Sequence, residues 1–284
     1  MKPTIGIVTN TLSPDLWGFD ENKFAKHLNF KKGADPYLTV FVDRWVFEAD
    51  RFESKYKVAL LAEPSVIEAG VAIWIKQNYD KFDAILTFQK EYCEISPKFK
   101  YCPLWIRHRL LNNSQSECRK VMKFYDKNKM TSAIFSNKYI SEGHKMRFAI
   151  RSEFQDEVDI YGRDHNFIEH KIEGIKDYRY HICVETTKES ICSMLVTDAV
   201  LCGTVPIYWG NKNSNINEFF NMDGIIMFET ISELENILEN VVSEEDYSQR
   251  LAAMKDNFNK AKDLNMHDLW WKYCIKDFFN GEAE

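Results

Sequence analysis

The sequence has no excess of basic residues, since 37 Lys and Arg stand against 43 Asp and Glu, and the formal net charge is −6 at pH 7. This balance excludes a broad nucleic-acid or membrane-surface footprint, which needs clustered Lys and Arg. It leaves room for one small basic pocket that binds a phosphate. The chain also lacks any run of about 18 apolar residues, so no transmembrane helix is expected.

Cysteine patterns typical of disulfide frameworks and metal sites are missing as well. The seven cysteines are scattered and odd in number, and none stands in a CxxC or Cys/His spacing. Buried reduced thiols in a cytoplasmic protein are the best interpretation. The N-terminus runs from Met1-Lys2-Pro3 directly into the apolar residues 4–8, which are too few for a signal peptide. No metal and no cofactor are expected.

What the sequence does contain is a repeated alternation of strand-length apolar runs and helical patterns. Its 284 residues suffice for two domains of about 100–200 residues each. Alternation of this kind predicts largely parallel sheets covered by helices. Strands are expected at 5–8, 37–42, 58–61, 84–87, 101–105, 131–135, 158–161, 180–184, 205–209 and 225–228. Helices are expected from residue 65 onwards and at 144–154, 190–202, 232–241 and 244–279.

The ends of these helices and the polar stretches between them suggest how the chain is organised. Ser65 with Glu68, and Ser243 with Asp246, have the spacing of N-terminal capping boxes. The polar residues 112–117 indicate a linker or a surface loop. We therefore expect an α/β protein of two Rossmann-like domains, 1–125 and 126–284, that face a cleft, with a helical C-terminal tail. The tail should pack its apolar residues on the rest of the chain, the N-terminal domain being one option; these residues are Leu269, Trp270, Tyr273 and Phe278.

Ligands of parallel α/β sheets bind beyond the carboxyl ends of the strands, so residues that directly follow strands are the candidates for chemistry. In the first half of the chain, Glu63 ends a strand and Pro64 stops it. Glu63 is either a general base or an ordinary capping or surface carboxylate. Asp43 also ends a strand and is the rival base, although Arg44 beside it suggests an ion pair.

In the second half, three further segments follow strands. Ser136-Asn137-Lys138 leads to Gly143, which opens a helix start that carries His144, Lys145 and Arg147. Cations disfavour a helix N-terminus, so these residues indicate either a bound anion or a solvated basic face. In 184–190, the hydroxyls of Thr186, Thr187 and Ser190 either cap a helix or contact a ligand. In 203–210, the aromatic residues Tyr208 and Trp209 are expected in the core.

Five blocks in fixed order carry a resemblance to a known family. They are Ile-Phe-Ser-Asn at 134–137, Glu-Gly-His-Lys-Met-Arg at 142–147, Asp-Ile-Tyr-Gly-Arg at 159–163, Lys-Asp-Tyr-Arg-Tyr-His-Ile-Cys-Val-Glu at 176–185 and Gly-Thr-Val-Pro-Ile-Tyr-Trp-Gly at 203–210. This region resembles glycosyltransferase family 10, the α-1,3/α-1,4-fucosyltransferases, and especially its short bacterial and viral-type members. In the N-terminal half, 61–64 and 82–87 are the recognisable points. The order of the blocks is more specific than any one of them.

The resemblance implies a GT-B fold and an inverting, metal-independent transfer of fucose from GDP-fucose to a glycan hydroxyl. Arg147 matches the arginine that holds the donor diphosphate, Glu185 an acidic residue that faces the donor, and Glu63 the base. The remaining candidates for donor binding are Asn137, Lys145, Thr186, Thr187, Lys188 and Ser190. In that family a Thr-Glu-Lys motif precedes the Gly-Thr-Val-Pro block, and its positions fall on Ser193, Met194 and Leu195 here.

This departure removes a carboxylate that contacts the ribose and a lysine that contacts phosphate. Lys188 and Lys212 are the candidates to replace the lysine. The alternatives are a transferase with a different nucleotide-sugar donor, and a catalytically weak relative that binds a nucleotide-sugar or a glycan as a recognition module.

Overall fold

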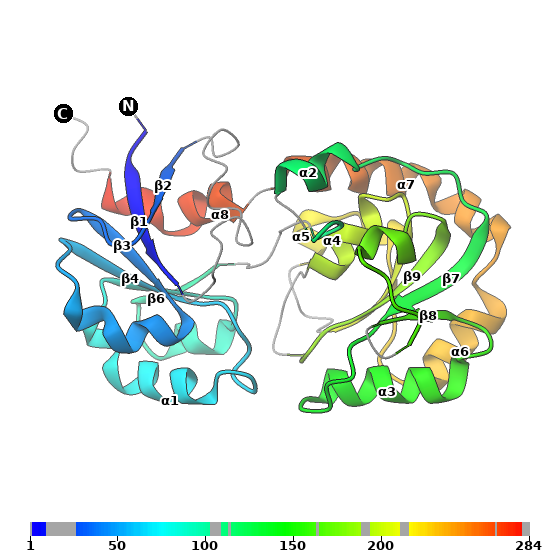
Figure 1. Ribbon diagram of the computed structural model, residues 1–284, viewed down its shortest axis with the longest axis horizontal. Helices are drawn as coiled ribbons and strands as arrows, with labels where there is room; N and C mark the ends of the chain where they lie inside the picture. The colour runs from blue at the N-terminus through cyan, green and yellow to red at the C-terminus, as the bar shows by residue number, and fades with distance from the viewer. Residues whose placement is uncertain are drawn as a thin grey trace. The chain divides into compact units, whose positions relative to one another are not determined.

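The computed structural model describes residues 2–9, 27–102, 109–112, 115–162, 165–188, 194–210, 216–264 and 266–279. The chain forms two compact units, shown in Figure 1: unit 1 comprises Met1–Arg107 and Asn265–Glu284, and unit 2 comprises His108–Leu264. Two domains were expected, but with the division at 125/126. In the structure the chain passes from unit 1 to unit 2 earlier, after Arg107. The C-terminal segment from Asn265 returns to unit 1, because the aromatic side chains of this segment pack on that unit.

Unit 1 contains a six-stranded parallel sheet in the order β2-β1-β3-β4-β5-β6. The strands are β1 (Thr4–Val8), β2 (Asn29–Lys32), β3 (Leu38–Val42), β4 (Tyr56–Leu61), β5 (Ala84–Thr87) and β6 (Phe99–Tyr101). All five residues of β3 are buried, as expected for a parallel strand that is covered on both faces. The direction of strand order reverses between β1 and β3, which makes this the topological switch point of the sheet.

Most of these strands confirm the expected segments. The expected strand at 101–105 begins earlier, as β6, and residues 103–105 lie outside the described part. The sequence did not indicate β2, because its four residues include only one apolar side chain, Phe30.

The helical elements of unit 1 cover both faces of its sheet. They are η2 (Asp43–Arg51), α1 (Ala69–Asn78), η3 (Tyr79–Lys81), η4 (Lys90–Glu94), α8 (Met266–Tyr273) and η7 (Ile275–Phe278). Val71 and Ile75 of α1 are buried against Phe41 of β3. The expected start of α1 was wrong: the helix begins at Ala69, and the carboxylate of Glu68 pairs with Arg44 instead of capping the helix.

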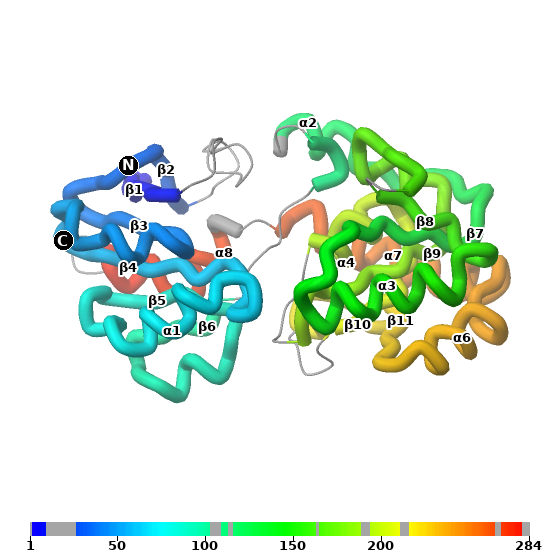
Figure 2. The backbone as a smooth tube through the Cα atoms, turned by 60° about the horizontal axis from the view of Figure 1, so that its bottom comes forward, coloured from blue at the N-terminus to red at the C-terminus, as the bar shows by residue number. Residues whose placement is uncertain are grey.

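The C-terminal segment packs on unit 1, as the aromatic spacing predicted. Trp270 is fully buried and meets Phe30 edge to face, with ring centroids 6.2 Å apart. The Phe278 ring lies 5.0 Å from that of Tyr56, and the Tyr37 hydroxyl donates to the Phe278 carbonyl at 2.6 Å. Phe30 and Phe41 point to opposite faces of the sheet by register, so α8 and α1 lie on opposite sides of it (Figure 2).

Unit 2 repeats the same architecture with a five-stranded parallel sheet in the order β11-β10-β9-β7-β8. The strands are β7 (Lys129–Ile134), β8 (Asp159–Tyr161), β9 (Tyr178–Val184), β10 (Val205–Trp209) and β11 (Ile226–Met227). All of them were expected within a few residues. The switch point of this sheet lies between β7 and β9, because the chain moves outward to β8 and then back across β7 to β9.

Helices cover both faces of the unit 2 sheet as well (Figure 1). They are α2 (Gln115–Lys120), α3 (Glu142–Phe154), η5 (Lys171–Gly174), α4 (Met194–Val200), α5 (Ile216–Phe219), η6 (Met222–Gly224), α6 (Ile231–Asn240) and α7 (Glu244–Asp263). One core cluster joins α3 and α6 to alternate strand residues such as Ile182 and Trp209. The other cluster joins α4 and α5 to the strand residues that face the opposite side of the sheet, such as Cys183 and Tyr208.

The tail expected as one helix over 244–279 is interrupted. Ser243 caps α7 by accepting from the Asp246 N–H, as predicted, and α7 ends at Asp263. Leu264 is extended, with ψ at 128°, and α8 of unit 1 follows it.

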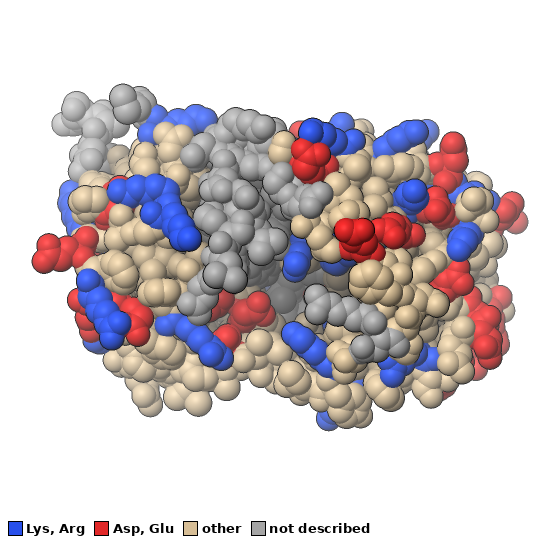
Figure 3. Space-filling model, viewed as in Figure 1, with Lys and Arg blue, Asp and Glu red and all other residues tan. Residues whose placement is uncertain are grey.

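The expectations for the cysteines, for membrane-spanning helices and for surface charge can be compared with the structure. Six cysteines lie in described residues, all of them as thiols, and five of these are buried. Within the described part, no helix combines the length and apolar character that a membrane span requires. Figure 3 shows Lys and Arg side chains interspersed with Asp and Glu on the visible face. On this face the described Lys and Arg side chains do not form one broad basic surface.

Candidate active site

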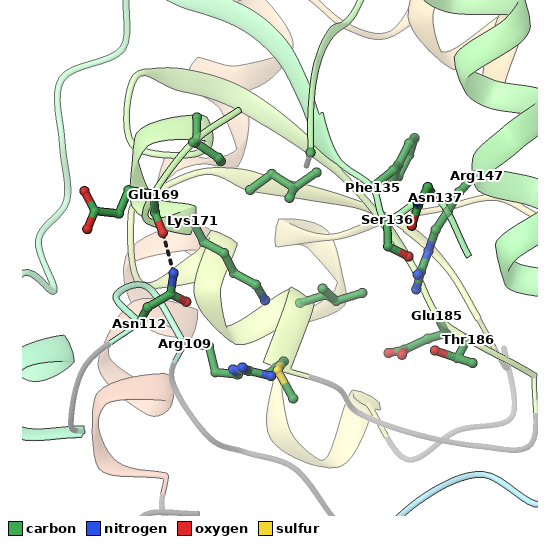
Figure 4. A pocket seen from close by; sticks show the side chains of 15 residues that line it. Arg109, Asn112, Phe135, Ser136, Asn137, Arg147, Glu169, Lys171, Glu185 and Thr186 are labelled. Atoms are coloured by element: carbon green, nitrogen blue, oxygen red, sulfur yellow. Dashed lines mark hydrogen bonds between the residues drawn. The ribbon is translucent and has the colours of Figure 1, made fainter. Parts of the chain in front are cut away.

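The main candidate site is a cavity of about 480 Å³ in unit 2, at the carboxyl ends of β7 and β9. It therefore lies at the switch point of the sheet, where parallel α/β sheets bind ligands. Its polar and charged lining residues are Arg109, Asn112, Ser136, Asn137, Arg147, Glu169, Lys171, Glu185 and Thr186 (Figure 4). Apolar side chains that include Ile134, Ile168, Met194 and Leu195 complete the wall.

The start of α3 forms one edge of this site, and its capping explains part of the basic segment. The Ser141 hydroxyl accepts from the His144 N–H at 3.3 Å, and His144 Nδ1 accepts from the Ser141 N–H at 3.3 Å. An accepting Nδ1 belongs to a neutral imidazole. Burial lowers the pKa of His144, and the charges of Arg147 and Lys138 lower it further. His144 is thus a buried capping residue, and the expectation that it joins a cationic cluster is corrected.

Gly143 lets the start of α3 touch the chain that leaves β9. A Cβ atom at this position would lie 1.7 Å from the Glu185 carbonyl oxygen. The Gly143 N–H donates to the Thr186 carbonyl at 3.1 Å, and the Glu142 carboxylate accepts from the Lys188 N–H at 2.7 Å. These contacts fix the segment after β9 against the helix, so its side chains keep defined positions at the cavity.

Arg147 lies one turn into α3 and reaches the end of β9. Its Nε and Nη2 donate to the Val184 carbonyl at 3.1 and 2.5 Å. Burial lowers the pKa of Arg147 while the nearby Glu185 raises it, and the guanidinium stays charged because its intrinsic pKa is so high. Nη1 has no hydrogen-bond partner within the described residues. The structure therefore offers an oriented cation on the cavity wall.

Glu185 provides the opposite charge on the same wall. Its side chain is 5% exposed, and its Oε1 accepts from the Tyr208 hydroxyl at 3.0 Å. The N–H of Glu185 donates to the Trp209 carbonyl at 3.0 Å, which continues the pairing of β9 with β10. Tyr208 and Trp209 are both buried, as expected for core aromatics.

The other residues singled out by the sequence divide into two groups. Asn137 and Thr186 line the cavity together with Arg147 and Glu185. Lys145 is exposed on α3, Thr187 is buried, and the Lys188 ammonium lies 4.9 Å from the Trp209 ring centroid; none of these three lines the cavity. Ser190, Ser193 and Lys212 fall outside the described residues.

Four lining residues, Arg109, Asn112, Glu169 and Lys171, were missed by the sequence reasoning. They belong to two segments far apart in sequence, neither of which directly follows a strand. The segments are joined by hydrogen bonds from the Ile172 N–H to the Leu110 carbonyl at 3.0 Å and from the Asn112 N–H to His170 Nδ1 at 3.3 Å. Asn112 Nδ2 also donates to the Glu169 carbonyl. This tertiary pairing has no signal in the sequence.

Unit 1 places Asp43 at its own switch point, directly after β3. Asp43 has a positive φ of 49°, which is uncommon outside glycine. Its Oδ1 accepts from the N–H groups of Ala62 and Glu63 at 2.7 and 3.1 Å. Burial raises the pKa of Asp43 to about 7, despite these two hydrogen bonds, and the charge of Glu63 adds to the shift. The ion pair suggested by the sequence is not formed, because Arg44 pairs with Glu68 at 2.7 Å.

Glu63 follows β4, the strand beside β3, and its side chain is exposed. The Asp43 carboxylate holds the turn in place by accepting from the backbone N–H of Glu63. The two carboxylates expected to compete for one role are thus neighbours at one sheet edge. Within the described residues of both units, no group of three or more His, Cys, Asp or Glu side chains is placed to hold a metal ion.

Comparisons with known proteins identify the architecture. No protein-family model and no curated protein matches the sequence. A solved α1,3-fucosyltransferase with GDP aligns over 94% of this chain and 92% of its own, with a TM-score of 0.56 and 14% identity. Anabaena HepE in complex with UDP-glucose aligns over 95% and 97%, with a TM-score of 0.57 and 11% identity. This is the GT-B fold.

A third solved structure, a T4 phage BGT mutant in complex with UDP-glucose, aligns over 96% of this chain and 99% of its own. Its TM-score is 0.52 at 11% identity. All three similarities extend over both units. At such low identities they show the fold, which was the one expected from the sequence.

Proposed function

We propose that the protein is a glycosyltransferase that binds a nucleoside-diphosphate sugar in the unit 2 cavity and transfers the sugar to a hydroxyl group of a glycan. The observation that carries this proposal is the cavity at the switch point of unit 2, with the Arg147 guanidinium and the Glu185 carboxylate on its wall. A donor of this class offers two phosphates for the cation and several hydroxyls for the carboxylate.

Arg147 has the role of stabilising the departing diphosphate. Negative charge develops on this group as its bond to the sugar breaks, and an oriented cation on a partly buried wall lowers the energy of that charge. The hydrogen bonds to the Val184 carbonyl hold the guanidinium in place before the ligand arrives. Rigid placement of this kind removes an ordering cost from the reaction.

Glu185 is assigned to hydroxyl groups of the donor, and Asn137 and Thr186 are assigned to the same ligand as neutral hydrogen-bonding groups. Lys145, Thr187, Lys188 and Ser190 remain candidates for donor binding. Lys145 and Lys188 lie off the cavity wall, so they are proposed as long-range electrostatic contributors.

GDP-fucose is the first donor to test, with inversion at the transferred carbon and without a metal. The sequence motifs of the C-terminal half support fucose as the transferred sugar. An α1,3-fucosyltransferase solved with GDP is among the proteins of similar fold. HepE and the T4 phage protein, in complex with UDP-glucose, make UDP-glucose the second donor to test. Glu63 is proposed as the general base that takes the proton of the acceptor hydroxyl, and Asp43 is its rival.

A recognition module that binds a nucleotide-sugar without transferring the sugar is the second candidate function. The observation in its favour is that Met194 and Leu195 present apolar side chains to the cavity. Neither side chain neutralises a phosphate. A module of this kind would bind nucleoside diphosphates but would release no sugar to any acceptor.

The test is a thermal-shift screen of nucleosides and nucleoside diphosphates, followed by transfer assays with the donors that bind. A ligand at 100 times its dissociation constant stabilises the protein by about 2.7 kcal/mol. Binding of a nucleoside diphosphate with transfer to a glycan supports the enzyme. Binding without transfer or hydrolysis, across acceptors, supports the module. A folded protein that binds no nucleoside diphosphate refutes both.

A further inference from the structure

Besides Arg147, the cavity is lined by two cations, Lys171 and Arg109, that the motif-based assignment does not use. In Figure 4, Lys171 and Arg109 extend inward from one side of the cavity, and Arg147 and Glu185 from the other. The Glu169 side chain on the same wall as Lys171 points away from the cavity. A diphosphate has two anionic groups, so a single guanidinium leaves one of them without a cationic partner.

Lys171 is held in place by a buried carboxylate. Its Nζ lies 3.2 Å from Oδ2 of Asp198, whose side chain is 1% exposed. Oδ1 of Asp198 accepts from the Arg109 N–H at 2.8 Å. Asp198 therefore holds the Lys171 ammonium and the backbone of Arg109. The Ile172 N–H, which donates to the Leu110 carbonyl at 3.0 Å, joins the same two segments.

The ammonium has hydrogen-bonding capacity beyond this ion pair. A lysine ammonium has three N–H donors, and Asp198 is the one acceptor that Lys171 contacts within the described residues. The side chain is 25% exposed and borders the cavity. Two donors thus remain for water or for a ligand, and an anionic oxygen is the acceptor that satisfies them best.

We propose that Lys171, positioned by Asp198, is a phosphate-binding residue that shares the donor diphosphate with Arg147. This inference rests on the proposed function, because it assumes that a nucleoside diphosphate occupies the cavity. It also explains how the cavity tolerates Leu195 on its wall: a cation reaches the same space from η5, a different element. Lys171 is expected to contribute to every nucleoside diphosphate, whichever base the protein prefers.

The experiment measures how much each phosphate contributes to affinity. Guanosine, GMP and GDP, and the corresponding uridine series, are titrated by calorimetry into the full-length wild-type protein and its variants. Lys171→Met alone leaves the Asp198 charge buried without its partner, which is strongly destabilising. The main variant is therefore Lys171→Met/Asp198→Asn, which removes both charges while the amide oxygen still accepts from the Arg109 N–H.

The double variant should bind the diphosphate roughly 10- to 100-fold more weakly than the wild type, with unchanged binding of the nucleoside. Asp198→Asn alone keeps the ammonium but removes the carboxylate that positions it, so diphosphate affinity should fall by less than in the double variant. Lys260→Met, which breaks the exposed pair with Asp256 on α7, is the matched control and should behave as the wild type.

Three outcomes overturn the inference. The double variant keeps the wild-type preference for diphosphate over nucleoside, or Asp198→Asn weakens diphosphate binding as much as the double variant does, or the double variant weakens nucleoside and diphosphate equally. The last result would place Lys171 at the base or ribose. A folded wild-type protein that binds no member of either series refutes the proposed function instead, so the two failures are distinguishable.

Discussion

Asp43 gives a prediction about the pH dependence of stability that follows from its position alone. Its carboxyl group is withdrawn from water at the end of β3, and burial raises its pKa from 3.8 to about 7. The folded state therefore holds this proton more tightly than the unfolded state does. The resulting stabilisation is fully present below about pH 4 and is lost as the pH rises through about 7.

Replacing Asp43 by asparagine should remove this pH-dependent loss. The side-chain amide is uncharged at every pH, its oxygen still accepts from the Ala62 and Glu63 N–H groups, and asparagine tolerates the positive φ of 49°. A shift of about three pKa units corresponds to about 4 kcal/mol. Asparagine resembles the neutral acid, whose weaker hydrogen bonds are already included in this difference, so Asp43→Asn should be more stable than the wild type by up to about 4 kcal/mol at pH 8.

Urea unfolding at pH 4.5, 6 and 8, followed by tryptophan fluorescence, measures this difference. The signal reports mainly on unit 1, because Trp209 is the one of the seven tryptophans that lies in unit 2. Asp50→Asn is the control: Asp50 is an exposed carboxylate of unit 1 whose pKa is lowered by Lys81, so its replacement should give no gain at pH 8. An Asp43→Asn variant no more stable than the wild type at pH 8, or equally stabilised at all three values, would refute the reasoning.

Three further predictions concern the proposed reaction. Arg147→Ala should weaken GDP binding roughly tenfold or more, since it removes a charge-assisted contact worth about 1.5–3 kcal/mol; unchanged affinity measured by calorimetry in a folded variant removes Arg147 from the site. Glu63→Gln should leave donor binding nearly intact and lower the transfer rate by about 10²–10⁴-fold, the usual share of a general base. A wild-type rate for Glu63→Gln beside an inactive Asp43→Asn would assign the base to Asp43, whose raised pKa suits that role. Transfer should also persist in EDTA; activity lost there and restored by manganese or magnesium would contradict a metal-independent reaction.

Much of the fold was accessible from the sequence, for an identifiable reason. Buried parallel strands are nearly continuous apolar runs, and β5 and β10 stand out with the expected boundaries. The edge strand β2 did not stand out, because Lys31 and Lys32 at its end are exposed to solvent. Local sequence patterns predict a strand or helix that is buried, because burial requires apolar residues at regular positions. They fail for a strand such as β2, which forms by pairing with a neighbouring strand and stays partly exposed.

Helix starts show how tertiary contacts override local patterns. Ser243 caps α7 as its spacing with Asp246 predicted. The same spacing of Ser65 and Glu68 fails, because Glu68 is 2.7 Å from Arg44, a residue 24 positions away in sequence. At α3 the third helical residue, His144, completes the capping box with Ser141. Histidine is uncommon at this position of a capping box, so the sequence predicted a cation at His144 and did not indicate its capping role.

The candidate site illustrates the same limit with more consequence for function. Arg147 and Glu185 were found because each follows a strand of unit 2, and parallel strands bring their carboxyl ends to one edge. Lys171 was not found because its place depends on Asp198, a buried residue of α4, and on the segment 109–112, whose Arg109 N–H binds the same carboxylate. Read along the chain, Leu195 at a position expected to hold a cation indicates a damaged phosphate site. Read in space, the charge is present on another element of the same cavity. A phosphate requires a cation at the right point and does not depend on which segment supplies it, so the loss of a motif residue is weak evidence for the loss of the activity.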